Sequence, residues 1–241
     1  MLAVGSLALT GCGQKNQSNP NAGRGGGTTS KSAPLQDLNI KSRDEVKDGG
    51  TVRFSIETLP TMWNALHIDG NSVDLSTTIM GFIGANNFDI AEDGIPKPDT
   101  NYLQSYDVQT NGGKQVVTLH LNPKAKWNSG RTIDYTDYQA TWKATNGANE
   151  DFKMATSDGF NQIESVKKGD KDTDVVITYK GTYPDWTATW SSVMPKEGVG
   201  TPETFNNGWK QFKSEWFTGP FILDHIDQAQ KTLYLKRNPN W

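Results

Sequence analysis

The chain has 241 residues, 34% of them hydrophobic, and its 24 Lys and Arg nearly balance its 27 Asp and Glu, giving a net charge of −3. This length suits one large domain or two small ones, and the lack of a basic excess argues against a nucleic-acid partner. One Cys and three His exclude a disulfide framework and a structural zinc cluster. No apolar run approaches the ~20 residues of a membrane span. We therefore expect no metal site and no cofactor.

The first twelve residues, MLAVGSLALTGC, are small and aliphatic and end in Gly11 and Cys12. This pattern resembles the lipobox of bacterial lipoproteins, in which the Cys is diacylated and becomes the new N-terminus. The resemblance implies a signal segment over 1–12, lipid attachment at Cys12 and anchoring to the outer face of a bacterial cell membrane, because two acyl chains give stable anchoring. The alternative is a buried N-terminal element with an incidental Cys. A secretory signal begins with a basic region, and no Lys or Arg precedes Lys15, so we expect the true start to lie upstream.

Residues 13–49 are predicted to form a flexible tether. Their first part, GQKNQSNPNAGRGGGTTSKSAP, has almost no large apolar side chain and cannot bury enough surface to offset its ordering entropy. The tether is mildly basic, which would draw it to an anionic bilayer. A solvated linker without an electrostatic role is the alternative.

A folded region is expected over 50–241. Alternating β-branched and aromatic residues predict a strand over 51–56, followed by a loop over 59–64 that contains Pro60. Apolar residues at helical spacing predict a helix over 73–82.

The remaining elements are strand pairs separated by polar turns, with helices between them. Apolar alternation on either side of a turn predicts antiparallel pairs at 102–108 with 115–121, 163–166 with 174–179, and 221–226 with 232–236. Helix-start signals predict helices over 132–144, over 184–192 and from 201–203 onward. The fold class predicted is α/β, with a mixed sheet and hairpins.

Enzymatic motifs find little support. His67, His120 and His225 are far apart and form no metal-binding pair, and His120 is expected on the surface of a strand. No G-x-S-x-G elbow occurs, and the glycine run at 23–27 lacks the strand and the Lys-Ser/Thr of a phosphate loop. A glycosidase needs two carboxylates across a cleft, and the sequence singles out no such pair. We therefore expect a protein that is not an enzyme and has no catalytic residues.

Four short segments occur in an order that is informative. In chain order they are IAEDG…YLQS at 90–105, the AKWNSGRTI run with the Asp and Trp that follow it at 125–142, TGPF at 218–221 and LKRNPNW at 235–241. In this order they resemble the extracellular solute-binding proteins of the peptide/nickel type, which include the dipeptide- and oligopeptide-binding lipoproteins of ABC importers. One departure is Arg131, which stands where that family usually has Thr.

The resemblance implies a type II periplasmic-binding-protein-like fold, of which this chain would be the N-terminal lobe, with the second lobe missing. Such proteins hold their ligand between two lobes that close about a hinge. We therefore expect residues 50–241 to be an incomplete lobe that alone binds ligand weakly or not at all.

The resemblance also implies which residues face the ligand. The candidates are Leu59, Pro60, Thr61, Met62, Trp63, Asn64, Met194, Trp216, Phe217, Thr218 and Gly219. For Trp63, packing in the core is an equally open alternative. Trp127, Gly130, Asp137 and Trp142 match family positions that we interpret as structural, and Trp186 and Trp190, at i and i+4, are expected in the core.

The function implied is the lipid-anchored substrate-binding component of an ABC importer. Its partners would be a peptide or other small solute, the permease subunits and, through Cys12, the membrane, and the protein would be a monomer. One alternative is a surface lipoprotein of the same fold with a regulatory or scaffolding role in envelope biosynthesis. Another, suggested by the eight Trp, is a glycan-binding or hydrolytic module.

Overall fold

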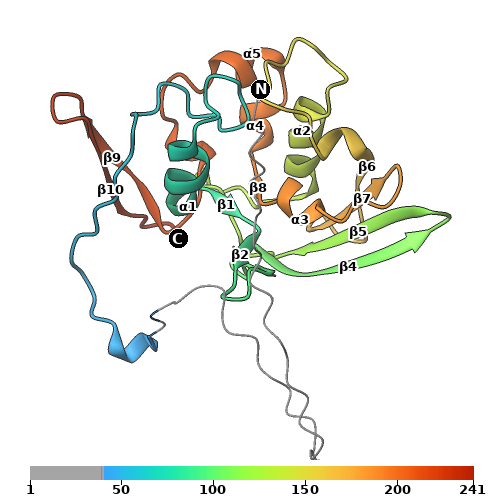
Figure 1. Ribbon diagram of the computed structural model, residues 1–241, viewed down its shortest axis with the longest axis horizontal. Helices are drawn as coiled ribbons and strands as arrows, with labels where there is room; N and C mark the ends of the chain where they lie inside the picture. Colours follow the sequence, from blue (N-terminus) through green and yellow to red (C-terminus); the bar gives the residue numbers. More distant parts are fainter. Residues whose placement is uncertain (1–38, 40) are drawn as a thin grey trace, which may run out of the picture. The chain divides into compact units, whose positions relative to one another are not determined.

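The computed structural model describes residue 39 and residues 41–241 (Figure 1). The expected signal segment, its Cys12 and most of the expected tether lie outside the described residues. Within the expected tether, a single 3-10 turn, η1 (Arg43–Glu45), is described.

A four-stranded antiparallel sheet is the largest element of the fold, and its strand order is β4-β5-β7-β6. The strands are β4 (Leu103–Asn111), β5 (Lys114–Leu121), β6 (Ile163–Lys168) and β7 (Asp174–Tyr179). Both strand pairs predicted from this part of the sequence are confirmed. The turn between β4 and β5 consists of Gly112 and Gly113, which both have positive φ, as a tight two-residue hairpin turn requires.

Side chains alternate along β5 between the buried face of the sheet and its solvent face. Val117, Leu119 and Leu121 are buried, whereas Thr118 and His120 lie on the solvent side. The expected surface position of His120 is therefore confirmed. One face of the sheet is covered, as is usual for antiparallel sheets.

Helix α2 (Tyr135–Thr145) packs beside β6 and β7. Asp134 caps it, with its carboxylate accepting a 2.8 Å hydrogen bond from the Thr136 amide. The other helical segments are shorter than three turns. They are η2 (Asp74–Ile79, a π-helix), α1 (Met80–Ile83), η3 (Phe160–Gln162), α3 (Trp186–Thr189), α4 (Lys196–Val199), α5 (Pro202–Asn207) and η4 (Ser214–Trp216).

Three two-stranded sheets complete the described fold. They pair β1 (Ala85–Asn86) with β8 (Ser192–Val193), β2 (Phe88–Ile90) with β3 (Pro96–Pro98), and β9 (Phe221–Asp227) with β10 (Thr232–Arg237). The last of these is the third predicted strand pair.

The predicted strand over 51–56 is wrong. This segment pairs with no strand of the described chain, and Val52 and Phe54 are 76% and 58% exposed. Alternation predicts an extended backbone but supplies no neighbouring strand, and a strand forms only where its backbone groups find partners. The chain is instead held just beyond, where the Asp74 carboxylate accepts hydrogen bonds from the amides of Glu57 and Thr58, both at 2.9 Å.

The predicted helix over 184–192 is also longer than the structure allows. Helix α3 covers only Trp186–Thr189, because the chain must turn into β8 to pair with β1. Trp186 and Trp190 are nevertheless buried in the core, as predicted.

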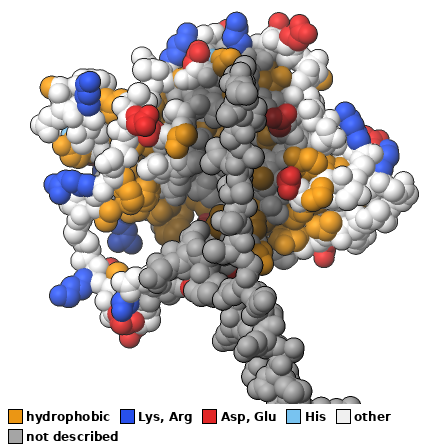
Figure 2. All heavy atoms as spheres, viewed as in Figure 1, with side chains coloured by type: hydrophobic (Ala, Val, Ile, Leu, Met, Phe, Trp, Pro, Cys, Tyr) orange, Lys and Arg blue, Asp and Glu red, His pale blue; other side chains and the backbone are white. Residues whose placement is uncertain are grey.

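Buried apolar side chains form two clusters. One, the sheet cluster, lies between the covered face of the four-stranded sheet and α2, and contains Val117, Tyr138 and Trp190. The other, the aromatic cluster, contains Trp63, Phe205 and Trp209 and lies under η2, α1, α4 and α5. Figure 2 shows charged side chains of both signs dispersed over the visible face, so no large field of one sign is seen there.

Candidate ligand-binding surface

The structure brings together two of the segments that the sequence suggests for ligand binding. The loop 59–64 reaches the segment 209–219, because the Trp63 amide donates a 2.9 Å hydrogen bond to the Trp209 carbonyl. Asn64 fixes the end of the loop: its Nδ2 donates to the Phe205 carbonyl at 3.1 Å.

A close backbone approach explains why a glycine follows this loop. A Cβ on Gly70 would lie 2.1 Å from the carbonyl oxygen of Asn64. A side chain at position 70 would therefore push the loop out of place.

Aromatic rings hold the two segments together. Trp63 packs edge-on against Phe212, with ring centroids 4.9 Å apart, and Phe212 stacks on Phe217 at 4.7 Å. Trp209 contacts both Phe217 and Trp216, at 5.6 and 4.6 Å. Offset and edge-on aromatic pairs each add about 0.5–1.5 kcal/mol beyond the area that they bury. The two segments therefore form one rigid unit.

Most of the candidate residues are buried in this unit. The buried ones are Met62, Trp63, Asn64, Met194, Phe217, Thr218 and Gly219. Leu59, Pro60 and Trp216 are half-buried, and Thr61 is exposed. For Trp63, which is 3% exposed, the packing alternative is the one that fits these contacts. The side chains that can reach a ligand from the described surface are thus those of 59–61 and Trp216.

Gly219 marks the other edge of this surface. Its φ is +118°, a backbone conformation that favours glycine, and a Cβ there would lie 2.7 Å from the Phe82 carbonyl oxygen. The neighbouring Thr218 amide donates to the Ile83 carbonyl at 3.1 Å. The surface is therefore built directly against the end of α1.

Two aromatic residues at the centre of this unit, Trp209 and Phe212, were not among the sequence candidates. The available signal was the aromatic spacing at 209, 212, 216 and 217, which is i, i+3, i+7 and i+8, the spacing of one helix face. The structure forms no continuous helix over these residues, and the irregular backbone around η4 brings the rings together instead.

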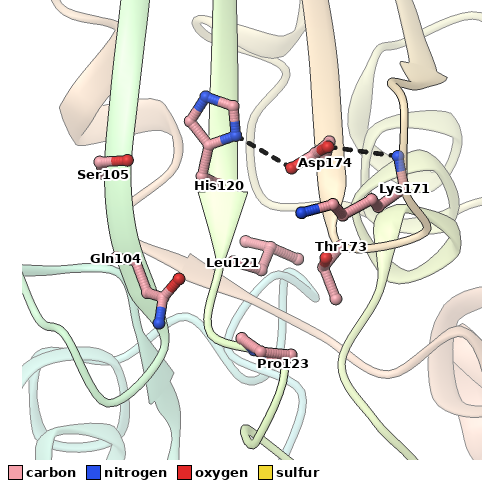
Figure 3. A pocket seen from close by; sticks show the side chains of 8 residues that line it. All are labelled: Gln104, Ser105, His120, Leu121, Pro123, Lys171, Thr173 and Asp174. Carbon is pink, nitrogen blue, oxygen red and sulfur yellow. Dashed lines mark hydrogen bonds and ion pairs between the residues drawn. The ribbon is translucent and has the colours of Figure 1, made fainter.

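A pocket lies at one end of the four-stranded sheet, and none of the candidate residues lines it. This polar pocket has a volume of about 360 Å³ (Figure 3) and is lined by Gln104, Ser105, His120, Leu121, Pro123, Lys171, Thr173 and Asp174. His120 stands between two carboxylates, with Nδ1 2.9 Å from Asp174 and Nε2 3.1 Å from Asp107. Hydrogen bonds to Asp174 and Asp107 raise the pKa of His120.

The pocket does not suggest metal chemistry. Asp174 and Asp107 use different nitrogens of the His120 ring, so they cannot share a metal ion with it. No group of three or more metal-binding side chains occurs in the part of the chain that the structure describes.

No helix among the described residues is long and apolar enough to cross a membrane.

The family model described as bacterial extracellular solute-binding proteins, family 5, middle region, matches residues 95–241. The chain is 32% identical over 246 aligned residues to the oligopeptide-binding protein OppA of Mycobacterium tuberculosis, an alignment that covers 99% of this chain and 40% of that protein. This chain thus spans about 40% of the length of the curated relatives that it matches first.

Solved structures resemble the described fold at lower sequence identity. The periplasmic EDTA-binding protein EppA matches with a TM-score of 0.67 and 22% identity, over 76% of this chain and 34% of its own. The oligopeptide-binding protein AppA of Bacillus subtilis, solved with a nonapeptide, matches with a TM-score of 0.62 and 19% identity, over 76% of this chain and 35% of its own. The expected α/β fold of the type II periplasmic binding proteins is therefore confirmed.

Proposed function

Because the chain belongs to family 5 of the bacterial extracellular solute-binding proteins, we propose that it serves as a substrate-binding component of an ABC importer and that its solute is a peptide. The observation that carries this proposal is the 32% identity to an oligopeptide-binding protein along 99% of the chain. The family consists of binding proteins and not of enzymes, so capture and release are the chemistry to explain.

The ligand would meet this chain at the surface formed by 59–61 and Trp216, beside the buried turn at Gly219. Two features support this choice. The rigid aromatic unit beneath the surface reduces the ordering cost of binding, and Trp216 is only half-buried, with the Lys213 ammonium 3.9 Å from its ring centroid. Backbone groups of an irregular segment suit a peptide, since main-chain hydrogen bonds accept many side-chain sequences.

A titration followed by nuclear magnetic resonance tests the ligand and its location together. The ¹⁵N-labelled chain is mixed with a pool of tri- to nonapeptides at about 5 mM, high enough to detect a dissociation constant near 1 mM. We expect amide shifts at Thr61, Trp216 and Gly219. No shift at this concentration, or shifts confined to the pocket beside His120, would overturn the assignment.

A pair of matched variants sharpens the result. Thr61→Asp places a charge on the candidate surface without disturbing the core, because Thr61 is exposed, and we expect it to reduce the peptide-induced shifts. Thr110→Asp makes the same change at an exposed position of the β4–β5 hairpin and should leave them unaltered. A parallel titration with oligosaccharides tests the glycan-binding alternative.

Anchoring and delivery complete the proposal. We propose that a lipid on Cys12 holds the protein, as a monomer, at the outer face of the cell membrane, where it passes its ligand to the permease subunits. Mass spectrometry of the membrane fraction should find acyl chains on Cys12, and a free thiol there would contradict the anchor. Peptide binding without loss of peptide uptake in a deletion strain would favour the non-transport alternative in envelope biosynthesis.

A further inference from the structure

A buried carboxylate joins the sheet cluster to helix α4. Asp137, in the first turn of α2, is 0% exposed. Its oxygens accept hydrogen bonds from the Trp127 indole at 3.1 Å, the Asp134 amide at 3.1 Å and the Lys196 amide at 2.9 Å. A buried charge is tolerated only when it is paired and hydrogen-bonded, and its counter-charge is Arg131, at 2.6 and 3.0 Å.

Arg131 holds a second carboxylate as well. Its Nη2 donates to the Glu197 carboxylate on α4 at 2.8 Å, and its Nη1 donates to the Thr132 carbonyl at 3.0 Å. The planar guanidinium can hold both acids because its donors point in fixed directions. Arg131 therefore bridges α2 and α4, in which Asp137 and Lys196 are 59 residues apart in sequence.

The same face of α2 binds the chain just before α4. Thr141, one turn beyond Asp137, accepts a hydrogen bond from the Met194 amide at 3.2 Å, and its hydroxyl lies 3.3 Å from the Met194 carbonyl. The segment 194–197 is thus attached to α2 in three ways. Thr141 and Asp137 of α2 bind it directly, and Arg131 connects Glu197 to Asp137.

Helix α4 in turn holds the candidate ligand-binding surface. The Trp209 indole donates to the Gly198 carbonyl at 2.8 Å, and the Trp209 carbonyl accepts from the Trp63 amide at 2.9 Å. Trp216 packs on Trp209 at 4.6 Å. A continuous set of hydrogen bonds and ring contacts therefore runs from Arg131 to the loop 59–64 and to Trp216.

We propose that Arg131 is a positioning residue for the candidate ligand-binding surface, because it locks α4 onto α2 and α4 sets the place of Trp209, Trp63 and Trp216. Its meaning for ligand capture rests on the proposed function, whereas its effect on α4 and Trp63 does not. This separates Arg131 from an ordinary surface ion pair, which contributes little. Asp137, one of the two carboxylates that Arg131 binds, is buried. Helix α4, which Arg131 holds in place, contacts Trp209 beneath the candidate ligand-binding surface.

Hydrogen exchange on the full chain tests the proposal without a ligand. In Arg131→Gln we expect the amides of Lys196 and Trp63 to exchange at least about ten-fold faster, the factor expected when hydrogen bonds to a charged group are lost. The β5 amides of Val117 and Leu119 should change much less. Arg131→Lys, which keeps the charge but not the planar fork, should restore part of the protection. Arg237→Gln, an exposed arginine on β10, is the matched control and should change none of these amides.

Two outcomes would overturn the proposal. One is an equal loss of protection in β5, Lys196 and Trp63, which would make Arg131 a general stabilising residue. The other is an unchanged exchange rate at Trp63. If Arg131→Gln does not fold, Glu197→Gln decides, because it leaves the pair between Arg131 and Asp137 in place. Faster exchange at Lys196 and Trp63 in that variant supports the proposal, and no change contradicts it.

The peptide titration then connects positioning to binding. Arg131→Gln should reduce the peptide-induced shifts at Thr61 and Trp216 while the chain stays folded. If the unaltered chain shows no peptide-induced shifts, the proposed function fails and the exchange result still stands by itself. If the unaltered chain binds and Arg131→Gln binds equally well despite faster exchange, the link from positioning to binding is wrong.

Discussion

His120 connects three strands of the central sheet, because its two ring nitrogens face Asp174 on β7 and Asp107 on β4. Both carboxylates hold a proton on the imidazole, so the pKa of His120 is raised above its usual value. A group with a raised folded-state pKa stabilises the fold fully below its unfolded-state pKa, which is about 6.5 for His. That contribution is lost as the pH rises through the folded-state pKa.

We therefore predict that His120→Gln destabilises the chain more at pH 5.5 than at pH 8.5. The side chain of His120 is 36% exposed, and exposed ion pairs contribute about 0.2–1 kcal/mol each, so the pH-dependent part should be of that size. Urea unfolding of both proteins at the two pH values measures it. Asp107→Asn should remove part of the same pH dependence, and an equal loss of stability at both pH values would contradict the assignment.

Gly198 is required by the ring of Trp209. A Cβ at this position would lie 2.3 Å from Cζ2 of Trp209, and the indole cannot retreat because its Nε1 bonds the Gly198 carbonyl. We expect Gly198→Ala to cost about 1–3 kcal/mol in unfolding free energy, as overpacking usually does.

Gly81 provides the matched control for this substitution. It also lies in a helix, but a Cβ there would meet nothing within 4 Å. Gly81→Ala should therefore raise the free energy of unfolding by about 0.5–1 kcal/mol, the ordinary helix preference for Ala. Equal effects of the two substitutions would show that the Trp209 contact does not decide the cost.

The side-chain amide of Asn238, the residue that follows β10, connects the β9–β10 hairpin to two distant turns. Asn238 is buried, and its Nδ2 donates to Asn128 Oδ1 and to the Gly219 carbonyl, both at 2.8 Å. The main-chain amide of Asn128 also donates a hydrogen bond to the Phe217 carbonyl at 2.8 Å. These bonds tie the β9–β10 hairpin to the turn after Trp127 and to the candidate surface.

Removing this amide should loosen the hairpin. Asn238→Ala leaves buried acceptors without donors, which costs about 1–3 kcal/mol, and we expect faster hydrogen exchange across Phe221–Arg237. Asn240, two residues on, is exposed, so Asn240→Ala should have little effect. Unchanged exchange in the hairpin of Asn238→Ala would contradict this role.

The same elements indicate what a sequence can predict. The hairpin β4–β5 and the start of α2 follow local rules, since the turn glycines Gly112 and Gly113 and the Asp134 cap act within a few residues. The segment 51–56 has an equally clear local pattern, but a strand depends on a partner, and none in the described chain pairs with it. The predicted helix over 184–192 is too long for a related reason: the pairing of β8 with β1 overrides helix propensity.

That 59–64 and 216–219 contact a ligand stays a prediction, and the exposure of their side chains could not be predicted. The family resemblance selected both segments, and the structure brings them together at Trp209. Whether a side chain faces a ligand or the core depends on what packs behind it. Trp63 and Phe217 are buried by Phe212 and Trp209, which lie in irregular backbone although their spacing in the sequence is that of a helix face.

For the molecule as a whole, the strength of ligand binding follows from how little of the candidate surface is exposed. Seven of the eleven candidates are buried in the chain's own core, which leaves 59–61 and Trp216 to make side-chain contacts. Association costs at least about 4 kcal/mol in lost translational and rotational freedom, and a few half-buried side chains offset little more than this. We expect the 241-residue chain to bind peptides of three to nine residues with dissociation constants weaker than about 100 µM. Isothermal titration calorimetry measures this directly, with Thr61→Asp as the variant that should weaken it further. A dissociation constant near 1 µM would show that the described surface suffices for tight capture, and would require contacts beyond those of 59–61 and Trp216.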